Sequence, residues 1–244
     1  MYDSPKFLSS GDSCLVVEFS DDIDMAANIR LQNLKRVLAG KKIRGAREFV
    51  PTYRSLSIHH DPTKLSRQTL EKIIKEALEN SDGGEEPDKR TVYLPVAYGG
   101  EYGPDMDNVS AHTGLSESEI IKRHTSREYY CYMLGFTPGF GYLGGMDETL
   151  ETPRLKTPRI LIPAGSVGIA GKQTGAYSID GPGGWQLIGR TPMPLFDPDC
   201  GEKPTLIDPG DWVVFRSVTA GEYDAIKKDA EMRRNSALEK RRAG

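Results

Sequence analysis

The apolar residues of the first eighty positions recur at two spacings, which predict strands and amphipathic helices in turn. The run from Cys14 to Phe19 predicts a strand. Residues 21–40 and residues 66–80 each carry an apolar stripe at helical spacing. The two stripes consist of Ile23, Ala27, Leu31, Leu34 and Leu38, and of Leu70, Ile73, Ile74, Ala77 and Leu78. Two strand-like runs lie between them around Pro51, so we expect the order βαββα in a small α/β sandwich with both helices on one face.

Residues 81–90, SDGGEEPDKR, combine glycine, proline and charge with no other apolar side chain, which is typical of a linker. We therefore expect an N-terminal domain over residues 1–86, with the boundary near Glu86. A second domain would cover residues 87–220. Residues 221–244 favour helix, but their apolar stripe stops before Arg234, so they predict a helical tail with a frayed end.

The second domain has the pattern of a β-barrel. A strand with a turn is predicted over residues 91–100, followed by a short helix over residues 115–126 that Ser116 can cap at Glu119. Beyond this helix, glycine and proline separate short β-rich runs at residues 128–136, 159–171, 176–180, 184–191 and 212–218. Such dense punctuation specifies turns and close backbone approaches, so the chain as a whole predicts an α+β protein.

Composition narrows the range of partners. The 244 residues carry a formal net charge of -3 with both signs interspersed, so no basic stripe favours nucleic acid. The three cysteines are far apart and odd in number, which indicates reduced thiols. The sequence has no apolar run long enough to predict a membrane span, and we expect a cytoplasmic location.

Three short motifs approach known sites without matching their context. Residues 139–144 have the spacing G-x-G-x-x-G, but Pro153 and Pro158 break the helix that a dinucleotide site requires, which favours a glycine-rich turn at the barrel rim. Residues 166–173 resemble a phosphate loop, yet Ser166 and Gln173 replace the required glycine and hydroxyl. Residues 164–168 resemble a nucleophile elbow but continue as strand.

Histidine and arginine provide the candidate chemistry. The four histidines lack metal-ligand spacing, so no metal site is predicted. His124 follows a short helix and could act as an acid or base, and a helix-terminal structural role is an equal alternative. The barrel strands and turns around it offer flat apolar walls, amides and a guanidinium that suit a small polar substrate. These residues are Phe140, Tyr142, Gln173, Thr174, Trp185 and Arg190, and packing is the alternative role for each.

Longer segments resemble one family. GFTPGFGYLGG, ETPRLKTPR, IPAGSVGIAGKQTGAYSIDGPGGWQLIGRT and PLFDP are similar to the family of the 5-oxoprolinase B subunit, also known as allophanate hydrolase subunit 1 or the sporulation histidine-kinase inhibitor. The resemblance extends to about Val218. It implies an N-terminal α/β domain followed by a cyclophilin-like barrel. The chain also resembles one half of the carboxyltransferase domain of urea carboxylase, where a second half completes the unit.

The resemblance implies a subunit that acts with 5-oxoprolinase subunits A and C to open the lactam of 5-oxo-L-proline to L-glutamate, with ATP consumed by the complex. The chain would be inactive alone. In this hypothesis His124 and Tyr142 assist proton movement, and Arg190 and Gln173 hold the substrate carboxylate and amide.

Two other functions stay open. The chain could inhibit a sensor histidine kinase through an apolar patch that includes Phe136, Pro138 and Phe140. A biotin-linked carboxyltransferase half would need a biotin carrier that this chain does not contain.

Overall fold

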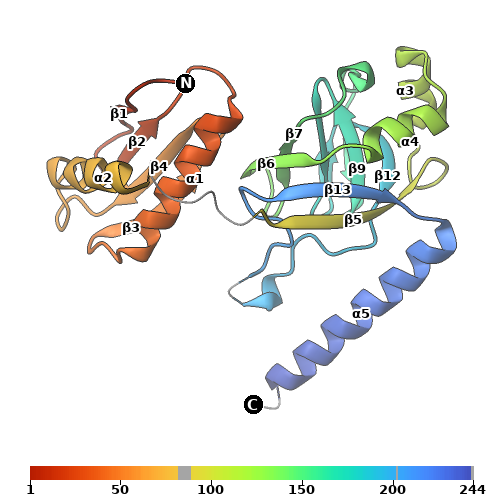
Figure 1. Cartoon of the computed structure of the whole chain (residues 1–244). Helices are drawn as coiled ribbons and strands as arrows, with labels where there is room; N and C mark the ends of the chain where they lie inside the picture. Colours follow the sequence, from red (N-terminus) through yellow and green to blue (C-terminus); the bar gives the residue numbers. More distant parts are fainter. Residues whose placement is uncertain (82–88, 202, 243–244) are drawn as a thin grey trace. The chain divides into compact units, whose positions relative to one another are not determined.

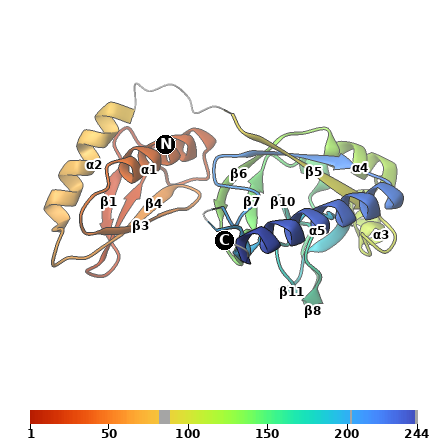
Figure 2. The same ribbon diagram turned by 90° about the horizontal axis from the view of Figure 1, so that it is seen from below.

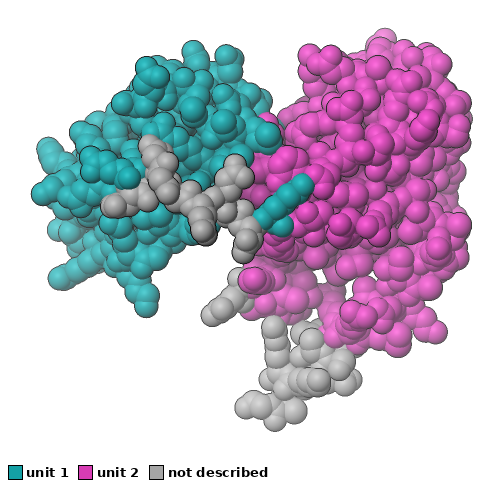
Figure 3. All heavy atoms as spheres, viewed as in Figure 1, with its two compact units in different colours: residues 1–89 teal, residues 90–244 magenta. Residues whose placement is uncertain are grey.

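The computed structural model describes residues 1–81, 89–201 and 203–242, which divide into two compact units, Met1–Lys89 and Arg90–Gly244 (Figures 1 and 3). The boundary expected near Glu86 lies outside the described residues. The C-terminal segment 221–244, which the sequence sets apart as a tail, groups with the second unit.

The first unit is a four-stranded antiparallel sheet with the order β1-β2-β4-β3 and two helices. Its elements are β1 (Lys6–Ser9), β2 (Cys14–Glu18), α1 (Met25–Gly40), β3 (Ala46–Pro51), β4 (Ser55–His60) and α2 (Arg67–Ser81). Leu15 lies opposite Ile58 and Val17 opposite Leu56, and all four are buried. The two helices share one hydrophobic core with these side chains, so both cover the same face of the sheet, as predicted.

Two details of the first unit differ from expectation. The sequence does not predict β1, because KFLS offers only two apolar residues beside Pro5, yet Phe7 pairs with Val17 at the sheet edge. α1 begins later than expected, because the Asp24 carboxylate caps it by accepting a hydrogen bond from the amide of Ala27. Ile23 consequently lies outside the helix and is exposed.

The second unit is built on a closed barrel with the strand order β10-β7-β6-β13-β5-β12-β9. Its strands are β5 (Thr91–Tyr98), β6 (Tyr129–Leu134), β7 (Gly141–Gly144), β9 (Ser166–Ala170), β10 (Gln173–Ala176), β12 (Gln186–Arg190) and β13 (Trp212–Ser217). β5 and β13 pair in parallel, and the other neighbours are antiparallel. The barrel confirms the predicted α+β class.

A separate two-stranded ribbon and several helices surround the barrel (Figures 1 and 2). The ribbon pairs β8 (Arg159–Ile162) with β11 (Gly181–Gly183). The helices are α3 (Met106–Thr113), α4 (Glu117–Thr125) and α5 (Ala220–Arg242), with short 3-10 turns η1 (Glu148–Leu150) and η2 (Pro198–Cys200). No described helix combines the length and the apolar character that a membrane span requires.

Several elements of the second unit correct the sequence-based expectation. The sequence does not predict α3, and β7 forms a strand where a turn is expected. β10 ends at Ala176, where the sequence predicts the start of a strand. α5 continues to Arg242 although its apolar stripe stops before Arg234.

Alternation along the barrel strands produces two hydrophobic clusters. The interior cluster fills the barrel and includes Val167, Ile169 and Ile188. Ala170 and Leu187 alternate with these positions and pack with side chains from the ribbon and the loops in a second cluster, here called the aromatic cluster: Phe140, Ile162, Ala170, Tyr177, Trp185 and Leu187, with Tyr142 packed against it. Gly175 makes room for the aromatic cluster, because a Cβ there would lie 3.3 Å from the Phe140 ring and 3.4 Å from the Trp185 ring.

Candidate functional site

His124 lies near the end of α4 with its side chain fully buried. Its Nε2 is 2.8 Å from Thr174 Oγ1, and its Nδ1 is 2.8 Å from Tyr98 Oη. The Thr174 hydroxyl donates its one proton to the carbonyl of Gly168 at 3.0 Å. It therefore accepts a hydrogen bond from Nε2–H of His124, and Nδ1 accepts one from the Tyr98 hydroxyl. This assignment gives a continuous chain of hydrogen bonds from β5 through α4 to β10 and β9.

The surroundings of His124 favour the neutral imidazole. Burial lowers the pKa of His124 to about 3 and raises the pKa of Tyr98 well above its usual value. The Phe215 and Tyr129 rings pack beside it, with centroid distances of 4.5 and 5.5 Å. The side chain therefore has no solvent access in this structure, which favours the structural alternative over the role of an acid or base.

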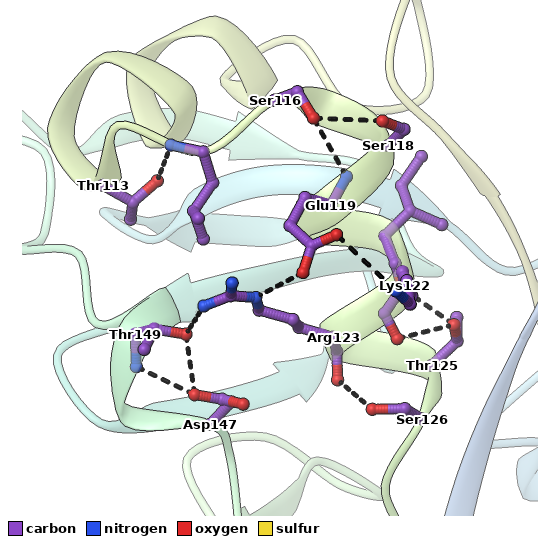
Figure 4. A network of polar contacts seen from close by, with 12 residues as sticks. Thr113, Ser116, Ser118, Glu119, Lys122, Arg123, Thr125, Ser126, Asp147 and Thr149 are labelled. Atoms are coloured by element: carbon purple, nitrogen blue, oxygen red, sulfur yellow. Dashed lines mark hydrogen bonds and ion pairs between the residues drawn. The ribbon is translucent and has the colours of Figure 1, made fainter.

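A polar network fixes α4 and hence His124 (Figure 4). Ser116 Oγ caps the helix by accepting from the amide of Glu119 at 3.3 Å. Arg123 donates from Nε to Glu119 Oε1 at 2.8 Å and from Nη1 to Thr149 Oγ1 at 2.6 Å. Thr149 in turn donates to Asp147 Oδ1 at 2.7 Å. The helix is thereby tied to η1 on the surface while its other face inserts His124 into the core.

Phe140 and Trp185 pack within the aromatic cluster rather than lining an open pocket. They are 2% and 6% exposed, and their ring centroids are 5.5 Å apart. Thr174 is fully buried and is committed to His124 and Gly168. Internal packing and hydrogen bonds occupy all three side chains, which favours the packing alternative over direct contact with a substrate.

Tyr142 and Gln173 keep part of their surface exposed. Thr174 lies opposite Leu143 in the β10–β7 pair, and both are buried in the barrel. Since successive side chains of a strand point to opposite faces, Tyr142 and Gln173 face outward. Tyr142 lies against Phe140 with ring centroids 5.2 Å apart. These two side chains could contact a ligand at the outer face of the barrel.

The segment that resembles a phosphate loop is a β-hairpin. β9 and β10 pair with Gln173 opposite Ala170 and Gly175 opposite Gly168. Its backbone groups therefore serve the β-ladder and do not form a cradle of free amides ahead of a helix. These residues do not fit a nucleotide phosphate.

Arg190 lies apart from the other candidates, in a cavity of about 350 Å³ between barrel loops and α5. Tyr223 and Lys227 come from α5, and Thr191 and Ser178 from the barrel side. The Arg190 Nε is buried without a hydrogen-bond partner in the described part of the chain. A guanidinium that is partly exposed in a cavity of this size suits a small carboxylate.

The charged side chains that line this cavity are of both signs: Arg190, Lys227 and Arg234 are basic, and Asp180 and Glu231 are acidic. Arg234 is held by Asp197 and Asp199 at 3.2 and 3.4 Å. Asp180 Oδ1 accepts a hydrogen bond from the amide of Ala164 at 2.7 Å. Burial raises the pKa of Tyr223, and Arg190 opposes that rise. Within the described residues Lys227 forms no ion pair, although Glu231 lines the same cavity, so Lys227 and Arg190 are the cations available to an anionic ligand.

The predicted site residues thus occupy four separate places. His124 and Thr174 lie together in the core, Phe140, Tyr142 and Trp185 pack together on the aromatic cluster, and the outward-facing Gln173 precedes Thr174 and points in the opposite direction. Arg190 lies in the α5 cavity.

Sequence reasoning missed two sets of residues. Tyr98 ends a predicted strand, but nothing in the sequence links it to His124. Tyr223 is visible as part of the tail's apolar stripe, whereas the position of Lys227 beside Arg190 required the structure. Across the described ranges, no group of three or more His, Cys, Asp and Glu side chains could hold a metal ion.

Comparison with known proteins adds relatives over most of the chain. Residues 5–207 match the family described as carboxyltransferase domain, subdomain C and D. The chain is 40% identical over 230 residues to the 5-oxoprolinase B subunit of Bacillus subtilis (strain 168), which covers 90% of this chain and 95% of that protein. It is 42% identical over 211 residues to the 5-oxoprolinase B subunit of Escherichia coli O157:H7, covering 84% of this chain and 92% of that protein.

Among solved structures, TTHA0988 superposes with a TM-score of 0.75 at 34% identity, over 85% of this chain and 40% of that chain. The chain therefore spans two fifths of that longer polypeptide. Together with the match over residues 5–207 and the identity to two bacterial proteins over nearly their whole length, this shows that the chain belongs to the carboxyltransferase domain, subdomain C and D, family, as the sequence motifs indicate.

Proposed function

We propose that this chain is the B subunit of an ATP-dependent 5-oxoprolinase, which opens the lactam of 5-oxo-L-proline to L-glutamate together with A and C subunits. The observation that carries the proposal is the 40% identity over 95% of a protein named as the B subunit of 5-oxoprolinase. Identity over so much of the relative's length supports the same role in a complex, whereas a shared fold alone would support only a shared architecture.

The α5 cavity is our candidate for binding the substrate carboxylate. Arg190 can donate two parallel hydrogen bonds to a carboxylate, and such charge-assisted pairs are stronger than neutral ones. Thr191 and Tyr223 line the same cavity and can provide further polar contacts. Its volume of about 350 Å³ suits a small lactam acid.

The remaining predicted residues receive different roles in the proposal. His124 and Thr174 position α4 and the barrel strands through their buried hydrogen bonds. Gln173 and Tyr142, which keep exposed surface, are the candidates for contacts to the substrate amide and for proton movement. Phe140 packs against Tyr142, and Trp185 packs against Phe140.

We assign ATP use to the complex rather than to this chain. An unstrained lactam resists water at neutral pH, so its carbonyl needs activation that ATP can supply. The hairpin of β9 and β10 does not fit nucleotide phosphates, so we do not place ATP on it. Binding and orientation of the acid are the contributions that its own side chains can make.

Reconstitution tests the proposal. The chain is coexpressed with A and C subunits, and ATP-dependent release of glutamate from 5-oxoproline is measured with and without it. We expect activity only in the full mixture. Undiminished activity when this chain is left out would contradict the proposal.

Arg190→Ala tests the carboxylate assignment in the same assay. Hydrogen bonds to charged groups contribute about 1.5–3 kcal/mol, so kcat/KM for 5-oxoproline should fall roughly 10- to 150-fold. The variant should turn over 2-pyrrolidinone, the lactam without a carboxylate, as fast as wild type does. Arg216→Ala, which removes an exposed guanidinium stacked over Tyr93, is the matched control. Equal losses for both lactams would exclude the carboxylate role.

Inhibition of a histidine kinase is the second candidate. Phe136 and Pro138 are exposed, which favours a docking role, whereas Phe140 is buried and cannot join the expected patch. An autophosphorylation assay of a sensor kinase with and without this chain discriminates the two functions.

A further inference from the structure

The β8–β11 ribbon presents large apolar side chains on both of its faces. Ile160 is 93% exposed and Leu161 is 64% exposed. They are adjacent on an extended strand, so they point to opposite sides of the ribbon. Figure 2 shows the ribbon extending away from the barrel.

The ribbon is held firmly at its base. Ile162 is fully buried in the aromatic cluster, and Arg159 donates to Asp105 at 2.6 Å. Asp105 is itself fixed by accepting from the amide of Leu187 at 2.7 Å. Exposure of Ile160 and Leu161 is therefore a feature of an ordered element, which lowers the entropy lost when a partner binds.

Phe136 adds a third apolar side chain beside the ribbon. It is 62% exposed and contacts Phe140 and Tyr177 with centroid distances of 5.7 and 6.4 Å. Its φ of +64° lies in the left-handed region, which is rare for a bulky residue and costs backbone strain. Tyr177 also lies against Ile162, since both crowd the Cβ position of Gly183. Ile160 shares its face of the ribbon with Ile162, so Phe136 and this face both lie next to the aromatic cluster.

Basic side chains flank this surface. Arg154 and Lys156 are exposed on the segment that leads into β8, and within the described residues neither forms an ion pair. A complementary partner would carry carboxylates at these positions. Because apolar residues occupy both faces of the ribbon, a flat surface would cover only one of them, and a groove is required.

We propose that Phe136, Ile160 and Leu161 form a docking surface that inserts into an apolar groove with an acidic rim on a second polypeptide. Its occupant is the chain that carries the remaining subdomains of the carboxyltransferase domain, which is the C subunit of the proposed complex. Two observations support this choice: the family match covers subdomains C and D only, and TTHA0988 carries this fold within a longer chain. The identity of the occupant rests on the proposed function.

Binding of the purified C subunit to the full chain tests the proposal. The Ile160→Ser/Leu161→Ser double variant should raise Kd roughly 100-fold, because truncated interface anchors each cost about tenfold. Phe136→Asn, which tolerates a positive φ, should also raise Kd. Met232→Ser removes an apolar side chain of 55% exposure on α5 and should leave Kd unchanged. Arg154→Glu/Lys156→Glu should weaken binding most at low salt.

Unfolding curves of the double variant should match wild type, since the altered side chains make few internal contacts. An unchanged Kd in this folded variant, or no binding of the C subunit to wild type, overturns the proposal. The proposal is also overturned if wild type forms a homodimer that the same substitutions disrupt. The same holds if a kinase dimerisation domain binds in place of the C subunit and the substitutions abolish that binding. Complex formation without glutamate release would defeat the proposed function while leaving the docking surface in place.

Discussion

The buried imidazole of His124 makes the stability of the barrel depend on pH. A histidine in an unfolded chain titrates near pH 6.5, whereas burial lowers the folded pKa of His124 to about 3. Between these values the unfolded state binds the extra proton. The contribution of this group to stability is therefore complete above about pH 6.5 and is lost as pH falls towards 3.

We expect the free energy of unfolding to decline with acidification more steeply in wild type than in His124→Gln. The difference in slope should reach up to about 1.4 kcal/mol per pH unit below about pH 6. Urea unfolding at a series of pH values measures it. His112→Gln, on the exposed surface of α3, is the control for replacing a histidine outside the core. Parallel curves for wild type and His124→Gln would show that His124 charges freely in the folded barrel.

The sequence could not separate the two roles of His124. Its position after a helix is equally compatible with a surface base and a core residue, and the decisive partners, Tyr98 and Thr174, are 26 and 50 residues away. The surroundings of Arg190 were equally hidden in the sequence, because α5, which lines its cavity, starts thirty positions later at Ala220. Side-chain type was predictable, but juxtaposition over such separations was not.

At the scale of elements, Gly165 sets the turn from β8 into β9 beside the α5 cavity. Its φ is +82°, and a Cβ would lie 2.3 Å from the carbonyl oxygen of Thr191. The backbone of Thr191 cannot retreat easily, because its amide donates to the Gly165 carbonyl at 2.8 Å. Both the conformation and the close approach therefore require glycine.

Gly165→Ala should lower the free energy of unfolding by about 3 kcal/mol or more, since a steric clash adds to left-handed strain. Gly171→Ala is the matched control: its φ is +56°, and nothing lies within 4 Å of the added methyl. Strain alone predicts a loss of about 1–2 kcal/mol there. Urea denaturation of both variants provides the comparison. Equal losses would mean that the Thr191 carbonyl moves aside.

Elements with a complete periodic pattern were predictable, and elements without one were not. α2 and α4 carry clear apolar stripes or a capping serine, and both occur as expected. α3 has only Met106 and Val109 buried, too few to mark a helix in the sequence. α5 outlasts its apolar stripe because Glu, Lys, Arg and Ala all favour helix without packing.

At the scale of the whole molecule, the hydrophobic core of the first unit shares no residue with the two clusters of the second unit. The core of the first unit contains Leu34 and the interior cluster of the barrel contains Val213, and both side chains are fully buried. The α+β class was predictable because each half has its own periodicity. Nothing in that periodicity specifies how strongly the two halves cooperate in unfolding.

We expect the two units to unfold separately, because loss of one core removes no side chain from the other. Leu34→Ala should destabilise the first unit by about 2–5 kcal/mol. Hydrogen exchange followed by mass spectrometry should then show faster exchange in peptides from residues 1–81 and wild-type exchange in residues 90–201. Val213→Ala is the reciprocal variant and should produce the opposite pattern. Faster exchange in both units from either substitution would mean that they fold as one cooperative body, and partner binding to the barrel would then stabilise the N-terminal sandwich as well.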